Sequence, residues 1–297
     1  DLCDGAVHEG DVGVAAGCAG AVHQEGVSDD GLLWGPVCGH AESVVVRVSG
    51  GYLTAPIGYF AHMRIATWNC QGALHKKLDV VAAIAADVLV VQETAEVVDA
   101  SSAGMLLNAW YPPYEDAKKG TGIFCAQGWQ ARWSTDEQRV PWARVAHLHH
   151  LISDTTIDLL AVWTNKNKND GRPPYAEQLA QTIATYEVDL SAGRLILAGD
   201  LNASVQGPSA EPHRRNLARL TALRMESAYH RSFGVSHGDE ADMTLRWVGP
   251  GHLVYDYHCD FVFLPIAQAE TATASVMRTF EWHRRVSDHQ PVIVDLP

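Results

Sequence analysis

Residues 194–204 read Arg-Leu-Ile-Leu-Ala-Gly-Asp-Leu-Asn-Ala-Ser, an apolar run that stops at a glycine. Such a run before a turn signal predicts a short buried strand. Asp200 and Asn202 follow it, and because alternate residues of an extended chain point the same way, their side chains are expected to share one rim. A carboxylate beside a carboxamide can orient a nucleophile next to a hydrogen-bond donor. The alternative for this motif in isolation is a polar turn that only ends a strand.

The composition indicates an acidic protein with a sizeable core. The chain has 297 residues, 47% of them hydrophobic, which is enough for one large or two small domains. Its net charge of −13 repels polyanions, so a phosphate site has to be local or bridged by a metal ion. Six cysteines without a C-x-x-C pair favour a reducing compartment, and we predict a cytoplasmic location. The sequence predicts no membrane span, no signal peptide and no protein partner.

Residues 1–62 differ in composition from the rest of the chain. They contain eight acids, a single arginine and no lysine, without a sustained helix or strand period. The first methionine, Met63, directly precedes an apolar run. We therefore expect Met63 to be the natural start and residues 1–62 to be a non-native or disordered extension, with a small accessory subdomain as the alternative. Residues 63–297 are expected to form one domain.

Apolar runs after Met63 predict an α/β fold. The expected strands cover residues 64–68, 87–93, 122–126, 144–152, 157–163, 195–198, 257–264 and 291–296. Helical spacing predicts a helix over residues 78–85, a second helix that Pro173 and Pro174 open, and a third, basic helix around Arg214. Residues 94–120, by contrast, have the composition of a loop.

Polar residues stand where several of these strands end. They are Asn69, Glu93, Asn165, Asp200, Asn202, Asp288 and His289. Asp260 lies instead within an aromatic strand, where a carboxylate is costly unless it is paired, and His289 is its candidate partner. Oxygen ligands from Glu93, Asn69 and Asp288 suit a hard ion, Mg²⁺ or Mn²⁺, better than zinc.

Five motifs resemble those of the endonuclease/exonuclease/phosphatase superfamily, whose members include exonuclease III, deoxyribonuclease I, inositol-polyphosphate phosphatases and neutral sphingomyelinases. They are Thr67-Trp68-Asn69-Cys70-Gln71-Gly72, Val91-Gln92-Glu93, Gly199-Asp200-Leu201-Asn202, Tyr257-His258-Cys259-Asp260-Phe261-Val262-Phe263 and Ser287-Asp288-His289-Gln290-Pro291. Each is weak alone, but all five occur in the family's order. The resemblance implies a deoxyribonuclease I-like, four-layer α/β/β/α sandwich of two mixed β-sheets and metal-dependent hydrolysis of phosphoesters.

The resemblance implies a metal site, and the sequence departs from the family pattern at two positions. Glu93 would be the main ligand of Mg²⁺ or Mn²⁺, with Asn69 and Asp288 nearby. Gln71 stands where exonuclease III-like members often carry an acid, which argues against a second metal there. Asn165 stands where many members place a Tyr or His, so the proton donor to the leaving group is left open.

The resemblance also implies four catalytic residues. Asp200 would orient or deprotonate the attacking water, and Asn202 would stabilise the phosphorane-like state by hydrogen bonding. His289, held by Asp260, would contact the scissile phosphate. From its position at the end of a strand, we expect Asp200 to be reachable by water and substrate, whereas Asp260 is expected to be buried.

Three further features are candidates for substrate binding. Asn165 can bind phosphate, and Lys166 and Lys168, with Arg172, form either a phosphate clamp or a solvated loop. Trp247 is either a stacking platform for a base or part of the core.

The function predicted from these residues is a divalent-metal-dependent phosphodiesterase, specifically a nuclease of the exonuclease III type acting on a phosphoester substrate, with DNA as a candidate. The alternatives are a phosphatase or lipid phosphodiesterase, of the inositol phosphate or sphingomyelin class, and a catalytically silent relative used for binding. Against silence, no core motif residue is replaced. Against extended duplex binding, the chain is acidic and lacks a long basic stretch.

Overall fold

The computed structural model describes the backbone of residues 34–36, 43–48 and 51–56, and residues 62–114, 117–135, 140–166, 171–207, 210–278 and 286–297 in full. The chain divides into two compact units, Asp1–His62 and Met63–Pro297. In the first unit, β1 (Trp34–Pro36), β2 (Ser43–Val48) and β3 (Gly51–Pro56) pair antiparallel in the order β1-β2-β3. That residues 1–62 are a non-native or disordered extension stays a prediction.

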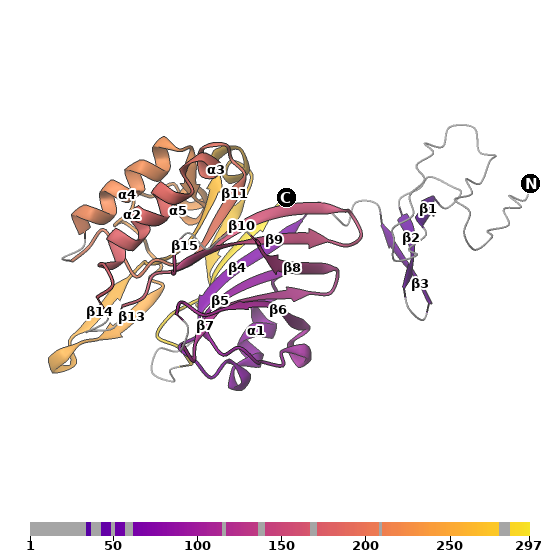
Figure 1. Cartoon of the computed structure of the whole chain (residues 1–297), viewed down its shortest axis with the longest axis horizontal. Helices are drawn as coiled ribbons and strands as arrows, with labels where there is room; N and C mark the ends of the chain where they lie inside the picture. Colours follow the sequence, from indigo (N-terminus) through magenta and orange to yellow (C-terminus); the bar gives the residue numbers. More distant parts are fainter. Residues whose placement is uncertain are drawn as a thin grey trace, which may run out of the picture. The chain divides into compact units, whose positions relative to one another are not determined.

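The second unit contains two six-stranded sheets (Figure 1). The first has the order β16 (Thr273–Val276), β17 (Val292–Leu296), β4 (Met63–Asn69), β5 (Val88–Thr94), β7 (Gly120–Ala126), β6 (Met105–Tyr111). The second has the order β12 (Met225–Ser227), β15 (Asp260–Pro265), β11 (Leu195–Asp200), β10 (Thr155–Trp163), β9 (Ala143–His150), β8 (Trp129–Trp133). The pairs β4–β5 and β10–β11 are parallel and the others antiparallel, so both sheets are mixed.

Strand alternation builds the core between the two sheets. Ile65 of β4 and Val88 of β5 face Ile196 and Ala198 of β11 in one buried cluster. Their neighbours along each strand, such as Leu197, point to the outer faces, where helices cover them. Strands buried on both faces explain the near-continuous apolar runs in the sequence.

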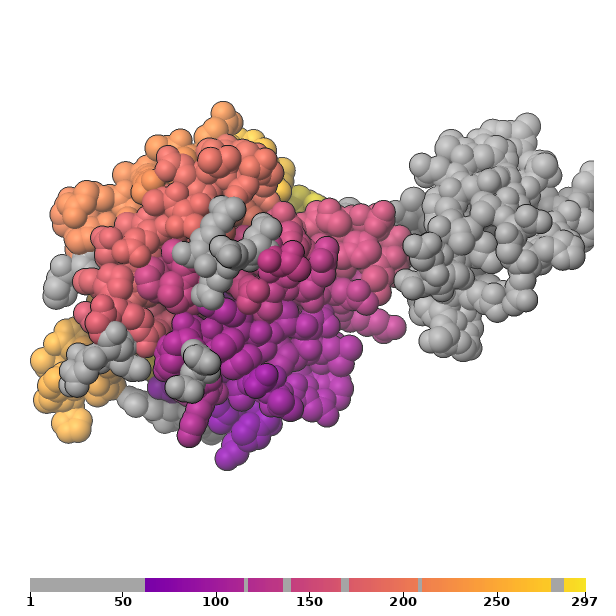
Figure 2. All heavy atoms as spheres, in the orientation of Figure 1, coloured from indigo at the N-terminus to yellow at the C-terminus, as the bar shows by residue number. Residues whose placement is uncertain are grey.

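Helices cover the outer face of each sheet. On the first sheet lie α1 (Leu78–Ile84) and the 3-10 turns η1 (Leu74–Lys76) and η2 (Ser101–Ala103). On the second lie α2 (Tyr175–Thr185), α3 (Glu187–Ser191) and α4 (Ala210–Ala222), and Figure 2 shows α2 and α4 in red and orange over that side. The shorter α5 (Ala228–Phe233) and α6 (Ile266–Ala269) pack beside β15. The layers confirm the predicted four-layer sandwich.

Three details differ from the sequence-based expectation. The expected loop 94–120 contains the strand β6, and β8 was not predicted. The expected strand 257–264 is two strands, because β14 (Val254–Tyr257) ends before β15 begins at Asp260. β14 pairs instead with β13 (Leu245–Val248), and with η3 (Pro250–His252) at its turn this hairpin protrudes at the lower left of Figures 1 and 2. Among the described residues, no helix is long and apolar enough to cross a membrane.

Candidate functional site

Three strands bring polar side chains to the same end of the space between the sheets. Asn69 is the last residue of β4, Asp200 the last of β11 and Asp260 the first of β15. Each continues the alternation of inward-facing residues: Asp200 follows Ala198 by two positions and Ile196 by four. In the antiparallel pair β11–β15, Asp200 lies directly opposite Asp260. The site is therefore a consequence of strand register.

Asp200 is held by the two carboxamides that flank it. Asn69 Nδ2 donates a hydrogen bond of 2.9 Å to Asp200 Oδ2, and Asn202 Nδ2 donates one of 2.7 Å to the same oxygen. The backbone amide of Asn202 donates to Oδ1 at 2.8 Å. Asp200 is 0% exposed, so the expectation that it lies open to water is wrong: these amides, one of them from Asn69 on the facing first sheet, close over it.

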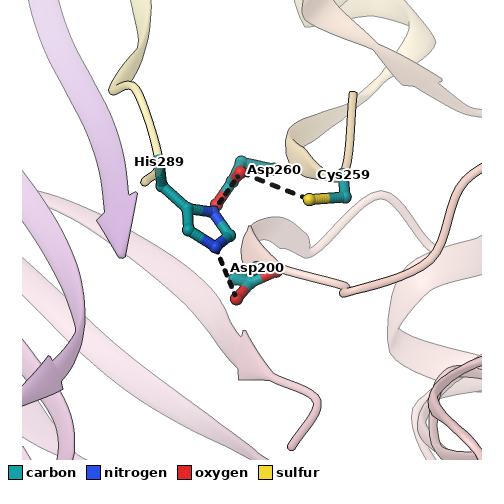
Figure 3. A group of neighbouring side chains, drawn as sticks. All are labelled: Asp200, Cys259, Asp260 and His289. Atoms are coloured by element: carbon teal, nitrogen blue, oxygen red, sulfur yellow. Dashed lines mark hydrogen bonds and ion pairs between the residues drawn. The ribbon is translucent and has the colours of Figure 1, made fainter. Parts of the chain in front are cut away.

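His289 lies between the two carboxylates (Figure 3). Its Nδ1 is 2.8 Å from Asp260 Oδ2, the pairing predicted from the sequence, and its Nε2 is 4.0 Å from Asp200 Oδ2. Burial alone lowers the pKa of His289, but the charges of Asp260 and Asp200 outweigh it and raise the pKa to about 10. The two carboxylates therefore favour the imidazolium form of His289, and its Nε2 faces Asp200.

Burial of Asp200 raises its own pKa to about 7, with the facing charge of Asp260 adding to the shift and His289 opposing it. The second oxygen of Asp260, Oδ1, is buried without a hydrogen-bond partner in the described structure. The end of the sandwich therefore concentrates acidic groups, and His289 offsets part of their charge.

Unusual backbone geometry places the polar groups at the strand ends. Glu93 and Asn202 have φ values of 59° and 45°, the left-handed region that non-glycine residues rarely adopt. At Gly199 a Cβ would lie 1.7 Å from the carbonyl oxygen of Val162, so only glycine fits directly before Asp200. Left-handed residues held by their surroundings are common at functional sites, and these two flank the buried acids.

Glu93 lies beside the buried acids and is half-buried. Its Oε1 accepts a hydrogen bond of 3.3 Å from Asn69 Nδ2, and its Oε2 lies 2.6 Å from Lys119 Nζ. Burial raises the pKa of Asp288, and the charge of Glu93 adds to that shift. The ammonium of Lys119 supplies a positive charge at Glu93.

Glu93, Asp288 and Asn69 carry oxygen donors of the kind that a hard divalent ion binds. Glu93 and Asp288 offer carboxylate oxygens, and Asn69 Oδ1, which accepts a 3.0 Å hydrogen bond from the amide of Gln71, retains a second lone pair. A second group of possible ligand atoms, from Asp200, Cys259, Asp260 and His289, lies within 4.8 Å of one another.

That second group suits a metal ion less well than the oxygen set. Burial raises the pKa of Cys259 well above its ordinary value, so this side chain is a neutral thiol, 3.6 Å from Asp260 Oδ2. The imidazole of His289 is already bound to Asp260. The four residues therefore form a hydrogen-bonded charge pair with a neutral thiol beside it.

The candidate substrate-binding residues are less tightly connected to the acids. The Asn165 side-chain amide donates a hydrogen bond of 2.8 Å to the carbonyl of Trp163. The carbonyl of the next residue, Thr164, accepts a hydrogen bond from Asn202. Lys166 is exposed, and Lys168 lies outside the described residues. Trp247 is 45% exposed on β13, so it is not part of the core, and it stacks on Tyr255 at a centroid distance of 5.4 Å.

Sequence reasoning missed two residues whose hydroxyl groups hold the backbone of the candidate site residues. The Thr244 hydroxyl accepts hydrogen bonds from the backbone amides of Cys259 and Asp260, at 3.0 and 3.1 Å. The Ser287 hydroxyl donates to the carbonyl of Asn69 at 2.7 Å and accepts from the amide of His289. Ser287 could have been found from its position two residues before His289, a spacing typical of hydroxyl-stabilised turns, whereas Thr244 carries no local signal.

Two packed mixed sheets with helices on their outer faces place this fold in the class of deoxyribonuclease I-like sandwiches. The chain belongs to the Endonuclease/Exonuclease/phosphatase family, whose model it matches over residues 66–289. Members of this family hydrolyse phosphoesters and generally use divalent metal ions, which supports a hydrolase. No curated protein matches the sequence.

Solved structures share the fold at low sequence identity. An AP endonuclease from Archaeoglobus fulgidus is 14% identical, with a TM-score of 0.57 over 78% of this chain and 98% of that one. The endonuclease domain of TRAS1, a telomere-specific non-LTR retrotransposon, is 18% identical, with a TM-score of 0.55 over 79% and 98%. The human Nocturnin catalytic domain with bound sulfate is 16% identical, with a TM-score of 0.55 over 80% and 93%.

Proposed function

We propose that this protein is a divalent-metal-dependent phosphodiesterase, specifically a nuclease of the exonuclease III type. The observation that carries the proposal is the arrangement around Asp200, where two carboxamides and the His289–Asp260 pair converge on one buried carboxylate. Phosphoryl transfer needs a positioned base, hydrogen-bond donors for the non-bridging oxygens and charge neutralisation. This cluster offers the first two.

Glu93, Asn69 and Asp288 would hold the metal ion, which we propose to be Mg²⁺ or Mn²⁺. When bound, this ion supplies charge neutralisation at the phosphate. In the structure the Lys119 ammonium lies 2.6 Å from the Glu93 carboxylate. Lys119 would leave this contact when the metal ion binds. The bound ion would reduce the repulsion between the carboxylates of Glu93 and Asp288.

Asp200 would accept the proton of the attacking water, or fix its orientation. Its pKa of about 7 suits a base that works near neutral pH. Water would reach it past Asn202, which is only partly buried. His289 donates from Nε2 toward the scissile phosphate, and Asp260 keeps that ring charged and oriented. Asn202 would exchange its hydrogen bond to Asp200 or to the Thr164 carbonyl for one to the pentacoordinate state.

The choice of a nucleic acid rests on the β13–β14 hairpin. Trp247 and Tyr255 present stacked, partly exposed rings there, and such rings bind bases by stacking. Asn165 and Lys166, with Lys168, would contact phosphates of the same strand. Two of the solved structures with this fold are described as endonucleases. A cytoplasmic location remains a prediction from cysteine usage alone.

The test is a substrate screen with the full chain. Plasmid DNA, abasic oligonucleotides, RNA, inositol phosphates and sphingomyelin are incubated with Mg²⁺, with Mn²⁺ and with EDTA, and Asp200→Asn serves as the control for contaminating activity. We expect metal-dependent cleavage of a nucleic acid by the wild type only. Turnover confined to inositol phosphates or sphingomyelin would overturn the nuclease assignment, and no turnover of any substrate would favour a silent relative.

A further inference from the structure

A second group of titratable side chains lies on α5 and the loop that follows it. His230 of α5 is buried, and its Nε2 lies 2.9 Å from Glu240 Oε1. The His237 ring packs on the His230 ring with a centroid distance of 3.6 Å. One ligand atom from each of His230, His237 and Glu240 lies within 4.8 Å of the other two. These residues are outside the five sequence motifs and take no part in the proposed reaction.

Ring nitrogens in and beside this group lack hydrogen-bond partners in the described structure. They include His237 Nδ1 and His258 Nε2, both buried. His258 is only 2% exposed, and its ring centroid is 5.4 Å from that of His230. Buried polar atoms are almost always paired, because an unpaired one costs free energy. The orphaned Nδ1 of His237, next to a histidine–glutamate pair, indicates a missing ligand.

We propose that His230, His237 and Glu240 bind a divalent transition metal ion of the zinc class, at a site separate from the oxygen ligands around Glu93. Two imidazoles and a carboxylate are a ligand set that zinc accepts and that Mg²⁺ does not prefer. Zinc bonds of about 2.0–2.1 Å in tetrahedral geometry place ligand atoms about 3.4 Å apart. To admit the ion, the His230–Glu240 contact of 2.9 Å would open by about 0.5 Å. The His237 ring, which stacks on the His230 ring at an interplanar angle of 30°, would turn so that its nitrogen points at the same ion.

The electrostatics of the three residues agree with this geometry. Burial, together with His230, lowers the pKa of His237 to about 3, so this ring is neutral and its lone pair is available. Burial opposes ionisation of Glu240, but hydrogen bonds from His230 and from backbone amides outweigh it and lower the pKa to about 2. His237 is partly exposed, which gives the ion a route from solvent.

A metal ion here would fix the loop between α5 and β13. That loop carries His237 and Glu240 and ends at Thr244, whose hydroxyl holds the backbone of Asp260. The site would therefore stabilise the segment that positions the Asp260–His289 pair. The inference does not depend on the proposed function, because a zinc ion can stabilise this loop whatever substrate the enzyme cleaves.

The test measures metal binding and thermal stability in the full chain. The protein is stripped with a chelator, returned to buffer with excess Mg²⁺ to fill the oxygen site, and titrated with Zn²⁺ while bound zinc and the melting temperature are recorded. We expect one zinc per chain at this site and a melting temperature that rises with Zn²⁺, as binding to the native state requires. His237→Phe keeps the stacked ring but removes its nitrogens, and should lose both effects.

Two further variants keep the test decisive. His147→Phe makes the same exchange on β9, where His147 pairs with Asp158, and should bind zinc like the wild type. If His237→Phe does not fold, Glu240→Gln, which preserves shape and removes the charge, replaces it. No zinc-dependent rise in the wild type, an equal rise in His237→Phe or Glu240→Gln, or loss of the bound zinc in Glu93→Gln would each overturn the proposal.

Discussion

Asp200 and Asp260 lie directly opposite each other in the antiparallel pair β11–β15, and both side chains are 0% exposed. Two facing carboxylates repel each other, and more strongly where water is excluded. His289 offsets part of this repulsion, with contacts of 2.8 Å to Asp260 and 4.0 Å to Asp200. The two acids share an environment, yet their partners differ, so substitutions at the two positions should have different effects.

Asp200→Asn should reduce kcat severely while the fold persists. The substitution removes the proposed base and one of two facing negative charges, so the free energy of unfolding should stay the same or increase. Melting curves without added metal, together with kcat on the substrate found in the screen, measure both quantities. An unstable Asp200→Asn protein would show that the carboxylate is needed mainly to hold Asn69 and Asn202.

Asp260→Ala should lower both activity and stability. It leaves the buried Nδ1 of His289 without an acceptor, which costs about 1–3 kcal/mol. We therefore expect a lower melting temperature than for the wild type under the same metal-free conditions. If Asp260→Ala melts like the wild type while Asp200→Asn melts early, the roles of the two acids are reversed.

Glu93→Gln should abolish activity with little loss of stability. The amide keeps the shape of the side chain and removes the charge that would bind the ion. Glu93 is only half-buried, so the substitution leaves the core intact. Activity with and without EDTA and a melting curve provide the measurements. Undiminished turnover of the wild type in EDTA would contradict the metal assignment.

Lys166→Ala with Lys168→Ala should raise KM for a polyanionic substrate. If these lysines contact phosphates, their removal also flattens the dependence of KM on salt concentration. A kinetic series at several salt concentrations makes the comparison. The control is Arg215→Ala on α4, which removes a positive charge that pairs with Glu211, far along the chain from the two lysines. An unchanged KM throughout the series would assign the lysines to a solvated surface.

Acid should weaken the fold partly through His213. This α4 residue is 0% exposed, neither ring nitrogen has a hydrogen-bond partner among the described residues, and burial lowers its pKa from 6.5 to about 4. Below pH 6.5 His213 binds a proton in the unfolded chain but stays neutral in the native state. The free energy of unfolding that His213 contributes above pH 6.5 is therefore lost as the pH falls toward 4.

The substitution His213→Leu isolates this contribution. We expect the melting temperature of the variant to fall less than that of the wild type between about pH 7 and about pH 5. Parallel curves for the two proteins would mean that His213 does not titrate differently in the folded and unfolded states.

Much of the fold could be predicted because local pattern and tertiary packing agree. Central strands such as β5 and β11 are buried on both faces, so each reads as an apolar run. β8 was missed because its residues are only partly buried or exposed, and β6 because it alternates within a segment of loop-like composition. Edge strands carry a weaker sequence signal, since water rather than protein contacts much of their surface.

The apolar runs of the sequence determined the α/β class and the strand ends that carry polar groups, and the order of the five motifs indicated the sandwich through its resemblance to the family. The cost of an unpaired acid in an aromatic strand pointed to His289 as the partner of Asp260. Only the tertiary structure decided that Asp200 is buried beneath Asn69 and Asn202, and that Thr244 holds the backbone of Asp260. It also gathered His230, His237 and Glu240. Burial and these contacts depend on how sheets and loops pack across long separations in the chain, which no local pattern encodes.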